Sequence, residues 1–67
     1  MDRAYEMIEV IGVSEESYAD ATRNAVTAAA KKYGNLSWFE VKEQRGRIEQ
    51  GQVTEFQVKL QCGARML

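Results

Sequence analysis

The only tryptophan of the chain, Trp38, is its strongest candidate for contact with a ligand. It stands among charged residues in the segment 36–48, LSWFEVKEQRGRI, which has the residue types of a long β-strand. A broad indole ring on an exposed strand face can stack on a flat ligand, whereas the same ring on the apolar face belongs to the core. The strand face that carries Trp38 therefore decides between a binding surface and simple packing.

The residue types needed for catalysis are scarce. The chain has no histidine and a single cysteine, and its sequence contains no recognisable cluster of metal-binding side chains. No activated nucleophile and no general acid–base arrangement can be identified either. We therefore predict a binding protein rather than an enzyme, with no catalytic residue and no metal site.

The length of 67 residues predicts one small domain, residues 1–67. A domain of this size buries only about 60% of the surface of its unfolded chain, so its stability as a monomer is marginal. A single cysteine excludes an internal disulfide. Self-association is therefore the expected source of extra stability, and a monomer with an unusually good core is the alternative.

The charges are nearly balanced, with nine basic and ten acidic residues and no basic block. Because binding to nucleic acid depends on neutralising phosphates, we expect no nucleic-acid partner. No apolar run approaches the roughly 18 residues that a membrane span needs, and no secretion signal is recognisable. The sequence therefore predicts a cytoplasmic protein without a membrane partner.

The hydrophobic periodicity predicts the order strand, helix, strand, strand, which is an α+β fold with β-α-β-β topology. The first strand is expected over residues 3–11 and is ended by Gly12. The helix is expected over about residues 15–33, with Ser14 or Ser17 as its N-cap. A stripe at helical spacing would let this helix lie close on a sheet: Tyr18, Ala21, Ala25, Ala29 and Tyr33.

The last two strands are expected to form a hairpin around a two-residue turn at Gln50–Gly51. This register places Phe39 opposite Cys62 on the side that faces the helix. The other side carries Trp38, Glu40, Lys42 and Gln44 from one strand and Gln57, Lys59 and Gln61 from its partner. Trp38 is therefore expected to point away from the helix.

One helix cannot cover strands of this length, so part of the sheet is expected to remain open to other copies of the chain. In the predicted register Gln57 faces Gln44, about 20 Å along the sheet from Trp38. A small ligand touched by both residues would therefore lie across a subunit boundary. A β-bulge near Arg45–Gly46 would shift the register beyond that point.

Several segments, in this order and spacing, resemble the dodecin family: residues 9–17 (EVIGVSEES), 38–41 (WFEV), 43–46 (EQRG) and 56–58 (FQV). The resemblance covers nearly the whole chain. It implies a three-stranded antiparallel sheet in the order 1-3-2, packed on one helix. It also implies a hollow homododecamer that binds flavins.

The resemblance further implies roles for individual residues. Trp38 would stack on the isoalloxazine ring, and Gln57 would hydrogen-bond its polar edge. Arg45 is a candidate for the flavin phosphate, with an ion pair to Glu43 or Glu55 at an interface as the alternative. The family is also associated with coenzyme A, for which the weaker candidates are Arg3, Tyr5 and Arg65.

These roles predict a store for FMN or riboflavin that quenches the photoexcited flavin by electron transfer from Trp38. The resemblance leaves open which of the two flavins is preferred. A structural homo-oligomer or interaction module, in which the tryptophan serves assembly only, is the main alternative. A small flavin reductase subunit is a third possibility.

Overall fold

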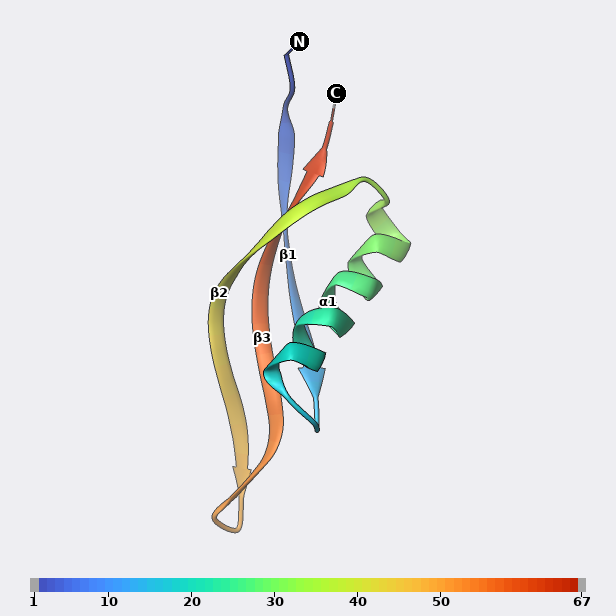
Figure 1. Ribbon diagram of the computed structural model, residues 1–67. Coiled ribbons are helices and arrows are strands. Elements are labelled where there is room, and N and C mark those ends of the chain that lie inside the picture. Colours follow the sequence, from blue (N-terminus) through green and yellow to red (C-terminus); the bar gives the residue numbers. More distant parts are fainter. Residues whose placement is uncertain (1, 67) are drawn as a thin grey trace.

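The computed structural model describes residues 2–66 and contains one helix and one sheet (Figure 1). The elements follow in the order β1 (Tyr5–Ser14), α1 (Tyr18–Tyr33), β2 (Leu36–Glu49) and β3 (Gln52–Arg65). β3 lies between β1 and β2 and pairs with both in antiparallel fashion. The predicted β-α-β-β topology and the 1-3-2 strand order are therefore confirmed.

The first strand begins and ends later than predicted. It starts at Tyr5 rather than Arg3, and it continues through Gly12, which pairs with Val58, as far as Ser14. A Cβ atom at Gly12 would collide with the carbonyl oxygen of Ala21 and with the side chain of Ala25. Gly12 is therefore the point at which the helix touches the strand, and the prediction that it ends the strand is wrong.

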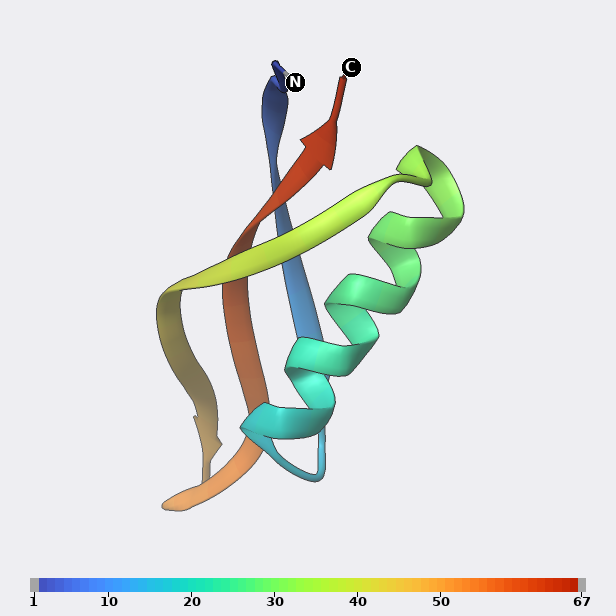
Figure 2. The ribbon, with the colours of Figure 1, turned by 45° about the horizontal axis from the view of Figure 1, so that its top comes forward.

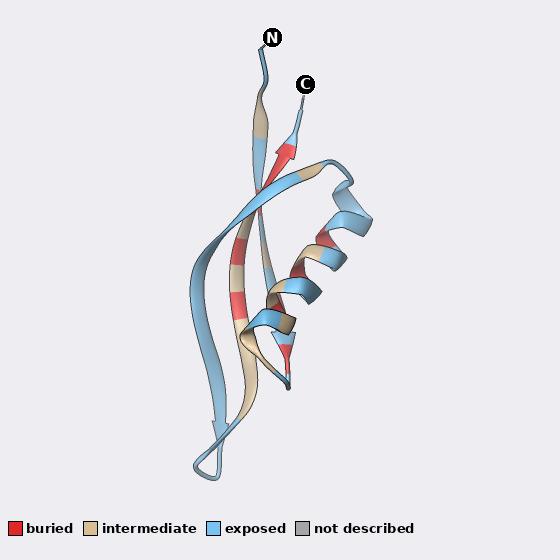
Figure 3. Ribbon diagram, in the orientation of Figure 1, coloured by how far each residue is buried: buried red, intermediate tan, exposed pale blue. Residues whose placement is uncertain are grey.

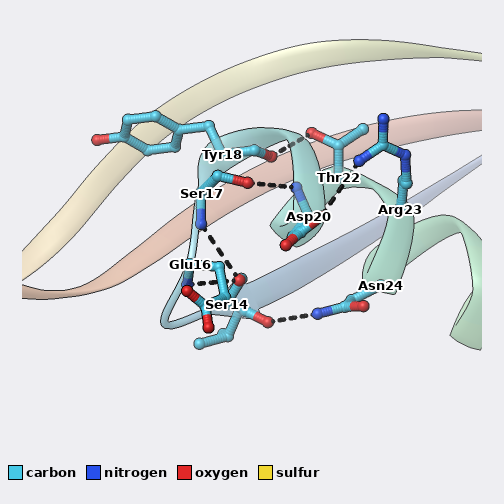
Figure 4. Close-up of polar contacts among 9 residues, drawn as sticks. Ser14, Glu16, Ser17, Tyr18, Asp20, Thr22, Arg23 and Asn24 are labelled. Carbon is cyan, nitrogen blue, oxygen red and sulfur yellow. Dashed lines mark hydrogen bonds and ion pairs between the residues drawn. The ribbon is translucent and has the colours of Figure 1, made fainter.

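The helix begins at Tyr18, three residues after the expected start, because residues 15 and 16 belong to the turn (Figure 4). The Ser17 hydroxyl accepts a hydrogen bond from the backbone N–H of Asp20 at 3.0 Å, which confirms Ser17 as the N-cap. The Ser14 hydroxyl accepts one from the backbone N–H of Glu16 at 2.9 Å. Ser14 therefore holds the turn and does not cap the helix.

The helix lies against one face of the sheet (Figure 2), and the hydrophobic core fills the space between them. Its centre consists of Ala21 and Ala25 from the helix and Val58, Leu60 and Cys62 from β3. Two alanines at this interface allow the helix to approach the sheet closely, as the predicted stripe requires. The tight hairpin at Gln50–Gly51 is also confirmed, since both of its residues have positive φ, 53° and 77°.

The helix leaves much of the sheet uncovered (Figure 3). In β2, every residue after Leu36 is exposed. Large apolar side chains remain at the surface of the described residues: Met7, Ile11, Val13, Tyr33, Trp38, Phe39, Val41, Ile48, Val53 and Met66. Large exposed apolar patches of this kind are typical of interaction surfaces.

Candidate functional site

Trp38 lies on the sheet face opposite the helix, as its alternation predicted. It pairs with Gly63, whose neighbour Cys62 points into the core on the helix side. The indole lies directly on Gly63, because a Cβ atom built there would collide with three atoms of the ring. The Trp38 residue remains 43% exposed, so its surface is available to a partner or a ligand.

Tyr5 of β1 meets the Trp38 ring across the central strand. The two ring centroids are 4.8 Å apart and the ring planes make an angle of 79°, an edge-to-face arrangement that suits the quadrupoles of both rings. Gly63 of β3, the partner of Trp38 in the register, has no side chain to separate the rings, whereas Tyr5 itself pairs with Arg65. The position of the indole is therefore set by Gly63 beneath it and by Tyr5 beside it.

Replacing Gly63 with alanine is expected to push the indole away from the sheet and from Tyr5. Such overpacking costs about 1–3 kcal/mol. Because Trp38 is the only tryptophan, its fluorescence emission reports the displacement as a shift towards longer wavelength. Gly51→Ala is the control, since it strains a positive φ of 77° in a turn with no neighbouring atom within 4 Å and should leave the emission unchanged. Identical emission spectra for Gly63→Ala and the wild type would contradict this placement of the ring.

The register of β2 shifts by one residue between Val41 and Glu43, so Lys42 has no partner in β3. Beyond this bulge, Arg45 faces Gln57 and Gln44 faces Val58. The prediction that Gln44 shares the face of Trp38 and lies opposite Gln57 is therefore wrong, because one extra residue turns every following side chain to the other face. A bulge was expected near Arg45–Gly46, but this shift occurs before Arg45, and the register has two other irregularities, between Leu36 and Trp38 and after Arg47.

Because of the bulge, a polar cluster forms around Gln57. The Arg45 Nε–H donates to Gln57 Oε1 at 3.1 Å, and the Gln57 Nε2–H donates to Glu55 Oε1 at 2.7 Å. Arg45 Nη1 also lies 3.4 Å from Glu43 Oε1. The structure thus brings two predicted site residues, Arg45 and Gln57, into direct contact, and it adds Glu55, for which only an ion pair with Arg45 was predicted.

The carboxylate of Glu43 is shared with a second cation. Lys59 Nζ lies 3.5 Å from Glu43 Oε2 and 3.9 Å from Glu9 Oε2, which links all three strands on the face of Trp38. Exposed ion pairs of this kind contribute at most about 1 kcal/mol each. Their main effect is to balance the charges on this face and to hold the long side chains in one arrangement.

The polar cluster and the aromatic pair lie far apart in one protomer. Trp38 of β2 pairs with Gly63 of β3, and Gln57 lies six residues before Gly63 on β3. Six residues of an extended strand span about 20 Å. The predicted separation of Trp38 and Gln57 is therefore retained despite the bulge. A single protomer cannot bring both residues to one small flat ligand.

The three candidate residues for coenzyme A, Arg3, Tyr5 and Arg65, lie near the start of β1 and the end of β3. Tyr5 faces Arg65 in the register, so these two residues are neighbours beside the aromatic pair. Arg3 is exposed and precedes β1 by two residues. The structure thus places two of the three candidates side by side and the third close to them in sequence.

The single cysteine, Cys62, lies in the hydrophobic core. Cys62 is buried on the helix side next to an apolar cavity of about 130 Å³, which is also lined by Val26, Leu36, Ser37, Trp38 and Phe39. Burial raises the pKa of the Cys62 thiol, which disfavours the reactive thiolate. The interpretation of Cys62 as a core thiol is therefore supported.

The fold and this exposed face define a small α+β protein in which one helix covers part of a three-stranded sheet. The open face carries the aromatic pair of Tyr5 and Trp38 and the polar cluster around Gln57. The sequence profile described as Dodecin matches residues 4–66. A dodecin of Thermus thermophilus is 42% identical over 66 residues, which cover 98% of this chain and 96% of that protein. The chain belongs to the dodecin family.

Solved structures agree with this assignment. The dodecin from Streptomyces davaonensis matches with a TM-score of 0.95 at 34% identity, over 100% of this chain and 98% of that one. The dodecin from Streptomyces coelicolor matches with a TM-score of 0.93 at 44% identity, over 98% of this chain and 94% of that one.

Proposed function

We propose that this protein is a flavin-binding storage protein that sequesters FMN or riboflavin and quenches its photoreactivity. The observation that carries the proposal is the exposed indole of Trp38, held on the open sheet face by Gly63 and Tyr5. One face of the ring lies on Gly63, so a flat ligand would stack on the other. Such a stack contributes about 0.5–1.5 kcal/mol beyond the burial of apolar area.

Quenching follows from the same contact. Trp38 would serve as the electron donor to a bound, photoexcited flavin, and the electron would then return, so that neither group would be changed at the end of the cycle. The flavin supplies this redox chemistry, and the protein supplies the position of the donor. No substrate is needed, which agrees with a binding protein rather than an enzyme.

The complete site would require several copies of the chain, and we propose that they form a hollow homododecamer. Trp38 and Gln57 are about 20 Å apart in one protomer, so both can reach one flavin only if they come from different protomers. The exposed apolar side chains of β1 and β2 support such an assembly. The flavin would then lie at a subunit boundary, with Trp38 on its ring and Gln57 at its polar edge.

Arg45 would bind the phosphate of FMN through the part of its guanidinium that contacts neither Gln57 nor Glu43. Arg45→Ala is expected to weaken FMN binding about tenfold more than riboflavin binding, since a charge-assisted bond is lost only with FMN. The difference should shrink at high salt. Titration of both flavins at two salt concentrations measures this effect, with Arg47→Ala as the control for removing a nearby positive charge. An equal loss of affinity for both flavins would exclude Arg45 from phosphate binding.

We propose coenzyme A as a second ligand, with Arg3, Tyr5 and Arg65 as its contacts. Two exposed arginines close to an aromatic ring suit a nucleotide with phosphate groups. We also place the protein in the cytoplasm, without nucleic-acid or membrane partners. Among residues 2–66, no helix is long and apolar enough to cross a bilayer.

The direct test is titration of riboflavin and FMN into the purified protein while flavin fluorescence is recorded. Strong quenching at a fixed stoichiometry supports the proposal. The exposed apolar surface also suits the alternative, a structural homo-oligomer in which Trp38 serves assembly only. That alternative predicts an assembled protein that leaves the fluorescence of both flavins unchanged.

A further inference from the structure

The amide group of Gln57 has a defined orientation in the protomer. Its oxygen accepts a hydrogen bond from the Arg45 guanidinium at 3.1 Å, and its nitrogen donates one to the Glu55 carboxylate at 2.7 Å. A guanidinium has only donors and an ionised carboxylate only acceptors. A flipped amide would place its nitrogen against Arg45 and its oxygen against Glu55, and both hydrogen bonds would be lost.

The strand register brings the three side chains together. Arg45 lies directly opposite Gln57 because of the bulge at Lys42. Glu55 lies two residues before Gln57 on β3 and therefore projects from the same face. Both Glu55 and Gln57 are partly buried, which strengthens hydrogen bonds to charged partners.

We propose that Glu55, together with Arg45, is a positioning residue that fixes which end of the Gln57 amide meets each polar group of the flavin. This inference rests on the proposed function. After the bonds to Arg45 and Glu55, the amide retains one lone pair on its oxygen and one hydrogen on its nitrogen. The amide oxygen can accept from the N3–H of the flavin ring, and the amide nitrogen can donate to an adjacent ring carbonyl. The amide therefore fits this edge of the flavin in one orientation only.

The role of Glu55 can be tested with riboflavin and with N3-methylriboflavin, which lacks the N3–H donor. In the wild type, riboflavin is expected to bind about tenfold more tightly than the methylated analogue. Glu55→Ala frees the amide to rotate and is expected to weaken riboflavin about fivefold, but to weaken the analogue less than about twofold. Glu55→Gln retains an acceptor oxygen at this position and should restore most of the discrimination.

Two further variants serve as references. Gln57→Leu removes the amide and should abolish the discrimination between the two flavins. Glu40→Ala removes a carboxylate of β2 from the same face of the sheet, opposite Gln61, and should leave the discrimination unchanged. Size-exclusion chromatography of each variant verifies that its assembly equals that of the wild type.

The possible outcomes separate the two proposals. If Glu55→Ala weakens both flavins equally, or neither, Glu55 does not position the amide, while flavin binding by the wild type still supports the proposed function. If the wild type binds both flavins equally well, Gln57 does not recognise the polar edge. The inference then fails, while the proposed function stands. If the wild type binds neither flavin, the proposed function fails and the inference fails with it.

Discussion

Trp38→Ala is expected to lower the affinity for flavin by about two orders of magnitude, because it removes both the aromatic stack and the apolar area of the indole. The ring lies on the sheet face opposite the core, so its loss should not hollow the core of the protomer. Circular dichroism is therefore expected to show a folded chain. Titration with riboflavin measures the loss of affinity.

The same variant tests the quenching mechanism. Any flavin that still binds to Trp38→Ala should recover its fluorescence, because the indole electron donor is gone. Trp38→Phe is the matched control: the phenyl ring retains part of the stack but is a much poorer donor, so binding should persist with weaker quenching. If Trp38→Ala unfolds the chain and the wild type binds no flavin, the tryptophan is a packing residue and the structural homo-oligomer is the better interpretation.

Light scattering at micromolar concentration is expected to give a particle of about twelve times the chain mass of 7.6 kDa. The physical reason is the surface that the helix leaves uncovered, where residues such as Ile11 remain 50% exposed. An isolated protomer would hold this apolar area in water and gain little stability from its small core. A folded monomer at this concentration would contradict the assembly and, with it, a site shared between protomers.

Ile11→Asp is designed to break the assembly without unfolding the protomer. Position 11 lies opposite Lys59 on the open face, so a carboxylate there has a positively charged neighbour within the protomer. Burying that charge at a subunit interface would cost several kcal/mol, and the particle should dissociate into smaller folded species. Ile11→Ala removes apolar volume without adding charge and should retain the large particle. Equal masses for Ile11→Asp and the wild type would show that this part of the sheet is not an interface.

Local patterns in the sequence determined much of this protein. Alternation along β3 identified the apolar face that carries Val58, Leu60 and Cys62, and pairing through the Gln50–Gly51 turn then placed Trp38 on the opposite face. The helix cap was narrowed to Ser14 or Ser17 in the same way, because a serine three residues before the N–H that donates to its hydroxyl is a short-range signal. These features depend on residues close in sequence or on a tight turn, so the chain specifies them without knowledge of its packing.

Other features of the site were decided by tertiary structure. The bulge at Lys42 placed Arg45 rather than Gln44 against Gln57, and this pairing created the cluster with Glu55. A bulge adds one unpaired residue to a strand, and alternation in the sequence does not fix where that residue falls when both faces carry polar side chains.

Close approach between distant segments was the second such feature. Gly12 reads as a break in the sequence, but it is the contact point of strand and helix, and Gly63 supports the indole beside Tyr5. A glycine permits a turn and a close contact alike, and only the three-dimensional neighbours show which of these the chain uses. The sequence thus determined the elements and the face of Trp38, whereas packing determined which side chains surround Trp38 and Gln57.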